Sequence, residues 1–246
     1  MRGIREQVVI ATKVDNICRQ EVATDMTVFQ YTTNYKRGED IPQKTQYTGN
    51  NLKSLRNSVE ASLKKLKTDY IDILYVHWWD YTCGVEEVMN GLHNLVAQGK
   101  VLYLGVSDTP AWIVTEANTY ARMSGKSPFV IYQGAWSILQ RDLEREILPM
   151  ALSEGKPCSA ETPLLALINI LVGLALAPWN VLAGGKIRTD AEEERRYQTG
   201  ENGRTLHGPW KRSETERGVC LALEQVAKEI GARSITAGEV LRCYHE

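Results

Sequence analysis

Polar side chains come directly after short apolar runs in this chain of 246 residues. Lys13 follows "VVIAT" and His77 follows "IDILYV". A lysine at such a point is either a charge leaving the sheet, or a partly buried ammonium that lowers the pKa of a nearby acid or forms a Schiff base. A single histidine is more often structural than catalytic, but Trp78 and Trp79 follow His77 directly. Both interpretations of each residue therefore stay open.

Three later runs end in the same way. Ser107 and Asp108 follow "VLYLGV", Gln133 follows "FVIY", and Trp179 comes after the proline of "LALAP". The polar residues are either ordinary caps of a strand end or a site for a flat polar ligand such as a carboxamide. The Trp179 indole is either core packing or a platform on which an aromatic ring stacks.

Apolar runs and amphipathic helical patterns alternate along the chain. The apolar runs predict strands at 8–13, 71–80, 101–108, 129–137 and 174–180. Apolar residues at three- and four-residue steps predict helices around 52–66, 85–96, 111–123, 142–154 and 219–230. Runs that are apolar on both faces suit parallel strands covered by helices. The alternation therefore predicts an α/β fold, either a doubly wound sheet or a TIM barrel.

The barrel is favoured on two grounds. No GxGxxG sequence follows the first run, which argues against a dinucleotide-binding fold of the Rossmann type. Polar and aromatic residues instead gather after successive strands, where a TIM barrel builds its active site. A closed barrel needs eight strands, and only five are found. We therefore expect a single, incomplete (β/α)8 barrel domain over residues 1–246.

Four longer stretches sharpen this prediction. "IDILYVHWWD", "GKVLYLGVSDTPAW", "IYQGAWSILQRDLEREILPMA" and "ALAPWNVLAGGKIR" together resemble the aldo-keto reductase superfamily. More narrowly, they resemble its fungal aryl-alcohol dehydrogenase branch, which includes norsolorinic acid reductase-like enzymes of polyketide toxin pathways. The resemblance covers residues 4–13, 31–155 and 173–237. It implies a (β/α)8 barrel that binds NADP(H) and reduces aldehydes or ketones by hydride transfer, and it implies that strands 1, 2 and 8 of that barrel are missing from this chain.

The resemblance also implies roles for single residues. The family uses a tetrad of Asp, Tyr, Lys and His, in which the Lys and the Asp tune the phenol that donates the proton. Lys13 matches the Lys, and His77 matches the His that orients the carbonyl. In the family the Asp and the Tyr precede the Lys strand, and this chain begins just before that strand. No residue here is carried over as the proton donor.

The cofactor and substrate positions follow from the same resemblance. Ser107, Asp108 and Gln133 match the residues that hold the nicotinamide carboxamide, and Trp179 matches the aromatic platform under the ring. The loop expected to close over the pyrophosphate consists of Asn180, Val181, Leu182, Ala183, Gly184, Gly185, Lys186 and Ile187. The side chains expected to contact a flat aromatic substrate are His77, Trp78, Trp79 and Trp136, although such tryptophans are just as often wall packing.

Two internal segments have no counterpart in the family. Residues 14–30 and 156–172 are each 17 residues long. Their edges can be encoded by splice-site sequences, and removing 156–172 restores "SEGLALAPW" in frame. We hypothesise that both are translated introns. Real loop insertions in a divergent paralogue are the alternative.

The overall composition adds mainly exclusions. A net charge of −1 gives no bias toward nucleic acid or anionic lipid, and five scattered cysteines suggest neither a disulfide framework nor a metal site. The apolar run 162–180 is best divided at Gly173 into an unplaced segment and a strand, so a membrane span is not expected. We expect a cytoplasmic protein with a small aromatic carbonyl or alcohol as its partner. The function is either that of an NADP(H)-dependent reductase or that of a non-catalytic remnant of one; an accessory subunit is a weaker third possibility.

Overall fold

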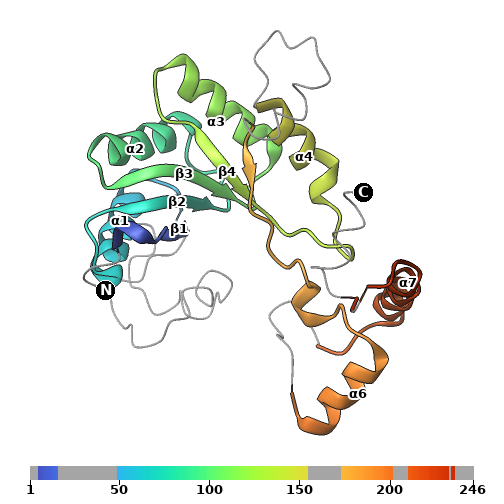
Figure 1. Cartoon of the computed structure of the whole chain (residues 1–246). Coiled ribbons are helices and arrows are strands. Elements are labelled where there is room, and N and C mark those ends of the chain that lie inside the picture. Colours follow the sequence, from blue (N-terminus) through green and yellow to red (C-terminus); the bar gives the residue numbers. More distant parts are fainter. Residues whose placement is uncertain (1–4, 16–48, 155–172, 202–209, 233, 236–246) are drawn as a thin grey trace. The chain divides into compact units, whose positions relative to one another are not determined.

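Five parallel strands form the framework of the first part of the chain (Figure 1). The computed structural model describes residues 5–15, 49–154, 173–201, 210–232 and 234–235. The strands are β1 (Ala11–Asp15), β2 (Ile71–His77), β3 (Val101–Ser107), β4 (Phe129–Gln133) and β5 (Ala175–Leu176). They pair in this order, each parallel to the next. The prediction of a parallel α/β sheet of incomplete barrel type is confirmed.

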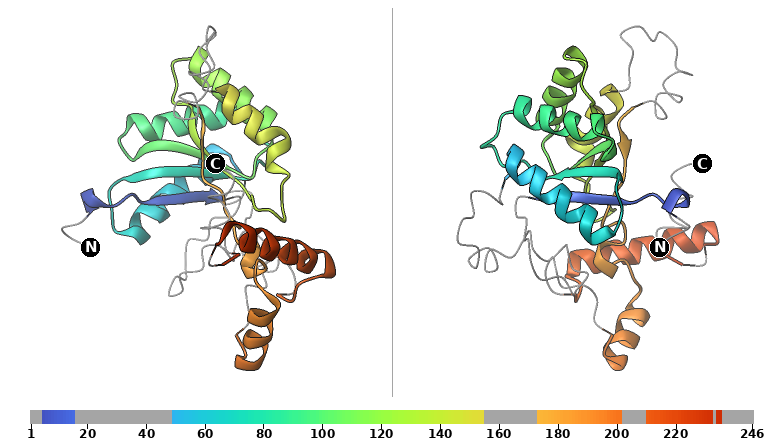
Figure 2. Two further views of the ribbon diagram at one scale, coloured as in Figure 1. Left: turned by 45° about the vertical axis from the view of Figure 1, so that its right-hand side comes forward. Right: turned by 90° about the vertical axis from the view of Figure 1, so that its left-hand side faces the viewer.

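Helices connect the strands and flank the sheet (Figure 2). They are α1 (Leu52–Leu66), α2 (Val85–Ala97), α3 (Ala111–Met123) and α4 (Leu143–Glu154), and each lies within one residue of its predicted bounds. Helix α1 begins where the Asn51 side chain accepts the Ser54 N–H, and it ends at Lys67 in the left-handed conformation. The short 3₁₀ helix η1 (Arg5–Gln7) precedes β1.

The two faces of the sheet differ in polarity. Leu74, Val76, Leu104 and Val106 are each at most 2% exposed. Successive side chains of a strand point to opposite faces, so the alternate positions of β2 and β3 lie on the other face. Those positions carry the side chains that could take part in binding or catalysis, such as His77, which ends β2.

Two strand ends differ from the sequence prediction. Strand β1 continues to Asp15, two residues into the segment 14–30 that was expected to be an insertion. Strand β5 covers two residues instead of the predicted 174–180. Pro178 has no N–H to continue the ladder, and Trp179 instead forms an isolated bridge with Ala135. Residues 16–30 and 156–172 lie outside the described residues.

The described residues divide into two compact units. One comprises 1–134 and 146–177, and the other comprises 135–145 and 178–246. A single domain over the whole chain therefore stays a prediction. Among the residues that the structure describes, no helix is both long and apolar enough to cross a membrane.

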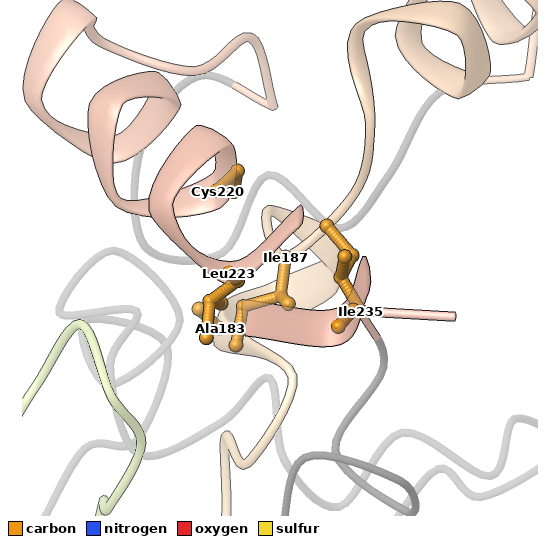
Figure 3. Close-up of a cluster of buried hydrophobic side chains, with 6 residues drawn as sticks. Ala183, Ile187, Cys220, Leu223 and Ile235 are labelled. Atoms are coloured by element: carbon orange, nitrogen blue, oxygen red, sulfur yellow. The ribbon is translucent and has the colours of Figure 1, made fainter. Parts of the chain in front are cut away.

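The second unit contains the 3₁₀ turn η5 (Ala183–Gly185) and the helices α6 (Asp190–Thr199) and α7 (Glu214–Ile230). Its core consists of Ala183, Ile187, Cys220, Leu223, Ala227 and Ile235 (Figure 3). Helix α7 begins five residues before the predicted 219, because Ser213 and Glu216 form a capping box there. Helix α6 was not predicted, since its sequence "DAEEERRYQT" has no apolar period and none of its residues is buried.

Candidate functional site

The predicted polar residues meet at the carboxyl ends of adjacent strands. His77 of β2 pairs with Ser107 of β3, and Ser107 pairs with Gln133 of β4. Lys13 of β1 lies opposite Tyr75, two residues before His77. Because Lys13 lies beside Tyr75, and Tyr75 and His77 are two positions apart, the Lys13 and His77 side chains lie on the same face of the sheet. Parallel strands thus bring together residues that are far apart in sequence.

Hydrogen bonds join four of these side chains into one cluster. The Lys13 ammonium donates to Ser107 Oγ at 3.0 Å, and Ser107 Oγ donates to Asp108 Oδ2 at 3.0 Å. The same carboxylate oxygen lies 3.1 Å from His77 Nε2. The residues expected to be catalytic, Lys13 and His77, are therefore linked through the residues expected to hold the carboxamide.

The Asp108 carboxylate is the negative centre of this cluster. Burial by itself raises the pKa of Asp108, but hydrogen bonds from His77 and Ser107 and the charges of His77 and Lys13 lower it more, so the pKa ends below its usual value. The carboxylate is thus ionised at neutral pH and can only accept hydrogen bonds. His77 Nε2 must then be the donor, which fixes where one imidazole proton lies.

The turn after β3 is held by Tyr132, a residue that the sequence did not single out. Asp108 has a φ of 51° and donates its N–H to the Gln133 carbonyl at 3.1 Å. The Tyr132 hydroxyl donates to the Thr109 carbonyl at 2.9 Å. Burial, and then the Asp108 charge, raise the pKa of Tyr132, so this phenol is a brace for the turn and a poor proton donor. The sequence indicated this role only through the position of Tyr132 directly before Gln133 in the run "FVIYQ".

The two tryptophans after β2 differ in exposure. Trp78 is 50% exposed, has a φ of 64°, and sets its ring edge-to-face with the His77 ring at 5.8 Å between centroids and 70° between planes. Trp79 is only 7% exposed. Trp78 therefore offers an indole surface beside His77, whereas Trp79 is packed inside. Substrate contact by either residue stays a prediction.

In the second unit, Trp136 and Trp179 are neighbours. The Trp136 backbone N–H donates to the Trp179 carbonyl at 3.0 Å. The Trp136 indole N–H donates to Glu144 at 3.0 Å. The hydrogen bond from Arg141, followed by that from Trp136, lowers the pKa of Glu144 to about 2. Both rings are partly buried, and their roles as platform and substrate contact stay predictions.

The loop 180–187 follows Trp179 and has an unusual backbone. Asn180, Ala183, Gly184 and Gly185 all have positive φ, up to 88° at Gly185. An added Cβ at either glycine would meet nothing closer than 3.7 Å. The glycines are therefore required by the left-handed conformation more than by close packing.

The rest of this loop is anchored in its own unit. The side chains of Ala183 and Ile187 belong to the buried core, Val181 is partly buried and Leu182 is 42% exposed. Lys186 forms a 2.7 Å ion pair with Glu216. The loop is thus attached to α7 on one side.

Buried arginines fix the other side of the loop, and sequence reasoning missed them. The Arg188 side chain is fully buried; it donates to the Gly185 carbonyl at 2.7 Å and to Glu193 at 3.0 Å. Its guanidinium lies over the Trp210 ring at 4.6 Å. Arg212 also pairs with Glu193 and donates to the Arg188 carbonyl at 2.6 Å. Arg188 and Arg212 thus share the Glu193 carboxylate, and Arg188 also binds the loop at the Gly185 carbonyl.

The first unit's cluster fits a nicotinamide carboxamide by its hydrogen-bonding chemistry. A carboxamide has two N–H donors and one carbonyl acceptor. The ionised Asp108 and the remaining lone pair of Ser107 can accept, and the Gln133 amide can donate. By contrast, within the described ranges no group of three or more His, Cys, Asp or Glu side chains could hold a metal ion.

Comparison with known proteins shows the family to which the chain belongs. The model of the aldo/keto reductase family matches residues 1–237. The chain is 59% identical over 241 residues to an aryl-alcohol dehydrogenase (NADP+) of Phanerodontia chrysosporium, covering 96% of this chain and 54% of that protein. It is 45% identical over 210 residues to norsolorinic acid reductase of Aspergillus flavus, covering 85% of this chain and 47% of that protein.

A third relative is norsolorinic acid reductase B of Aspergillus parasiticus, 42% identical over 230 residues, with 94% of this chain and 50% of that protein covered. The chain thus spans about half the length of these relatives. With its parallel sheet, the polar cluster at the strand ends and a family match over nearly its whole length, the chain belongs to the aldo/keto reductase family.

Proposed function

We propose that the complete protein is an NADP(H)-dependent oxidoreductase that reduces an aryl aldehyde or an aromatic ketone to the alcohol. The observation that carries the proposal is the hydrogen-bonded chain from Lys13 through Ser107 and Asp108 to His77. The named activities of the relatives support it, since they include an aryl-alcohol dehydrogenase (NADP+) and norsolorinic acid reductases.

In this proposal His77 donates a hydrogen bond to the carbonyl oxygen of the substrate; because Nε2–H is already bound to Asp108, the donor is Nδ1–H of the protonated ring. Asp108 holds the imidazole through Nε2, so the ring has one orientation before the substrate arrives. The Lys13 ammonium places a positive charge beside the same site, where it favours negative charge that develops on oxygen. The exposed Trp78 indole beside His77 forms a wall for an aromatic ring.

NADP(H), when bound, supplies or accepts the hydride. Ser107, Asp108 and Gln133 bind its carboxamide and thereby set which ring face meets the substrate. Trp179 supports the nicotinamide ring, and the loop 180–187 contributes backbone N–H groups to the pyrophosphate. We further propose a cytoplasmic location and, from the norsolorinic acid reductases among the relatives, a role in fungal secondary metabolism of the aflatoxin or sterigmatocystin type.

The test is a binding experiment, because binding needs no proton donor. NADPH is titrated into the chain, and its nicotinamide fluorescence is followed. We expect saturable binding that Asp108→Ala weakens at least tenfold, whereas Asp69→Ala at an exposed turn leaves it unchanged. Turnover of 3,4-dimethoxybenzaldehyde is measured on the same samples. Failure of the wild-type chain to bind NADPH would overturn the cofactor assignment.

A further inference from the structure

Asn50, just before α1, is bonded to the turn that follows β2. Its backbone N–H donates to Asp80 Oδ2 at 2.7 Å, and its Oδ1 accepts the Asp80 N–H at 2.9 Å. Its side-chain amide also donates to the Trp78 carbonyl at 3.3 Å. Asn50 is only 3% exposed. A single buried side chain therefore ties the start of one helix to the turn that carries Trp78.

The Asp80 carboxylate divides its two oxygens between two segments. Oδ2 accepts from Asn50, while Oδ1 accepts the N–H groups of Thr82 at 3.0 Å and Cys83 at 3.2 Å within its own turn. Burial alone raises the pKa of Asp80, but these backbone hydrogen bonds lower it more. Gly49 completes the contact, because a Cβ there would lie 2.3 Å from Asp80 Oδ2.

This contact holds Trp78 in an uncommon backbone conformation. A φ of 64° is strained for a bulky residue and persists only where the surroundings enforce it. Both backbone polar groups of Trp78 are bound, the N–H to the Ser107 carbonyl at 2.9 Å and the carbonyl by Asn50. The result is an indole that is half exposed and yet set edge-to-face against His77.

We infer that Asn50 and Asp80 are positioning residues for substrate recognition: together they fix the Trp78 indole as the platform for the aromatic ring of the substrate. The inference rests on the proposed function for the identity of that substrate. It assigns the preference for an aryl over an alkyl carbonyl compound to the contact between the start of α1 and the β2 turn, outside the Lys13–His77 cluster.

Two variants test the contact in different ways. Asn50→Ala removes the side-chain bonds to both Trp78 and Asp80. Asp80→Asn keeps one acceptor oxygen for the Thr82 and Cys83 N–H groups, but turns an amide NH2 toward the Asn50 N–H. The control is Glu87→Ala, since Glu87 also bonds the start of α1 by accepting the Leu52 N–H at 3.0 Å, a bond that does not involve Trp78 or Asp80.

Two readouts separate positioning from general loosening. The first is the chemical shift of the His77 Cε1–H proton, which senses the ring current of Trp78. The second is the dissociation constant of 3,4-dimethoxybenzaldehyde compared with that of cyclohexanecarbaldehyde. We expect both Asn50→Ala and Asp80→Asn to move the His77 signal and to weaken binding of the aromatic aldehyde about two- to tenfold, with the alkyl aldehyde unaffected. Trp78→Ala should show the same selective loss.

The inference is overturned if Asn50→Ala behaves like Glu87→Ala in both readouts, or if the two aldehydes lose affinity equally. The proposed function fails separately. If the wild-type chain does not bind NADPH but the variants still lose affinity for the aryl aldehyde selectively, the inference about Trp78 holds and the cofactor assignment fails. If the wild-type chain binds NADPH but no aryl aldehyde, the cofactor assignment holds and the inference about Trp78 is overturned.

Discussion

Lys13 and Ser107 are 94 positions apart, and the lysine ammonium donates to the serine hydroxyl at 3.0 Å. Strand β2 lies between the two strands that carry them, so the long lysine side chain reaches across a whole strand. Ser107 is fully buried and passes the contact on to Asp108 at 3.0 Å. This serine hydroxyl is therefore the junction between a cation and an anion.

Ser107→Ala should lower the free energy of unfolding by about 1–3 kcal/mol, because it removes a buried hydroxyl that bonds two partly buried charged groups. Urea unfolding followed by circular dichroism measures the loss. Ser153→Ala is the control, since the bond that its hydroxyl donates, to the Met150 carbonyl, is local to α4. Equal losses in the two variants would contradict a special role for Ser107.

The Asp108 carboxylate should make stability depend on pH in a defined direction. Folding lowers the pKa of Asp108 below its usual 3.8, so the folded state favours the ionised form. That contribution is present above pH 3.8 and is lost as the pH falls through the folded pKa. Asp108→Asn should therefore be less stable than the wild type at pH 7, and the difference should shrink below about pH 4. Unfolding series at several pH values test this, with Asp69→Asn as the control for the loss of one charge.

Gly105 should not tolerate a side chain. A Cβ there would lie 2.6 Å from two carbons of the Tyr75 ring and 3.0 Å from Ile131. Gly105→Ala should cost about 1–3 kcal/mol of unfolding free energy by overpacking, and Tyr75→Leu in the same chain should recover part of it. Gly218→Ala in α7 has open space around the new methyl group and should stabilise the helix by about 0.5–1 kcal/mol. A harmless Gly105→Ala would show that the Tyr75 ring moves aside freely.

The ion pair between Arg188 and Glu193 should be important to the stability of the second unit. Arg188→Ala leaves the shared carboxylate of Glu193 with one cation fewer and removes the bond to the Gly185 carbonyl. We expect a loss of about 1–3 kcal/mol, because Arg212 still pairs with Glu193 while the Gly185 carbonyl loses its donor; amide hydrogen exchange in α7 measures the loss. Arg195→Ala breaks an exposed 3.3 Å pair with Glu201 and should cost less than about 1 kcal/mol. Similar exchange rates in both variants would mean that burial of the pair adds nothing.

The two segments without a family counterpart make a prediction about the transcript. If 14–30 and 156–172 are translated introns, the spliced RNA lacks both. The chain would then join Lys13 directly to Tyr31. Sequencing the cDNA decides the matter, since a transcript that retains both segments rules the introns out.

The sequence alone was sufficient to determine the order and type of most elements. Apolar runs of strand length and three- to four-residue periods gave α1, α2 and α3 nearly to the residue, because burial of one helix face leaves a regular pattern. The same pattern failed for α6, which buries no face and is held by its caps and ion pairs. Single residues such as Lys13 and His77 could be named because they lie at or near the carboxyl ends of the strands that position them.

Only the tertiary structure decided what those residues touch. No pattern in the sequence pairs Lys13 with Ser107, since strand register and the reach of a side chain set that contact. Nothing in the sequence distinguishes Asn50 from any other polar residue before a helix, or Arg188 from any other charged residue after a glycine loop. Their roles depend on carboxylates brought to them by the folded chain, Asp80 and Glu193, and a contact of that kind exists only once both partners are in place.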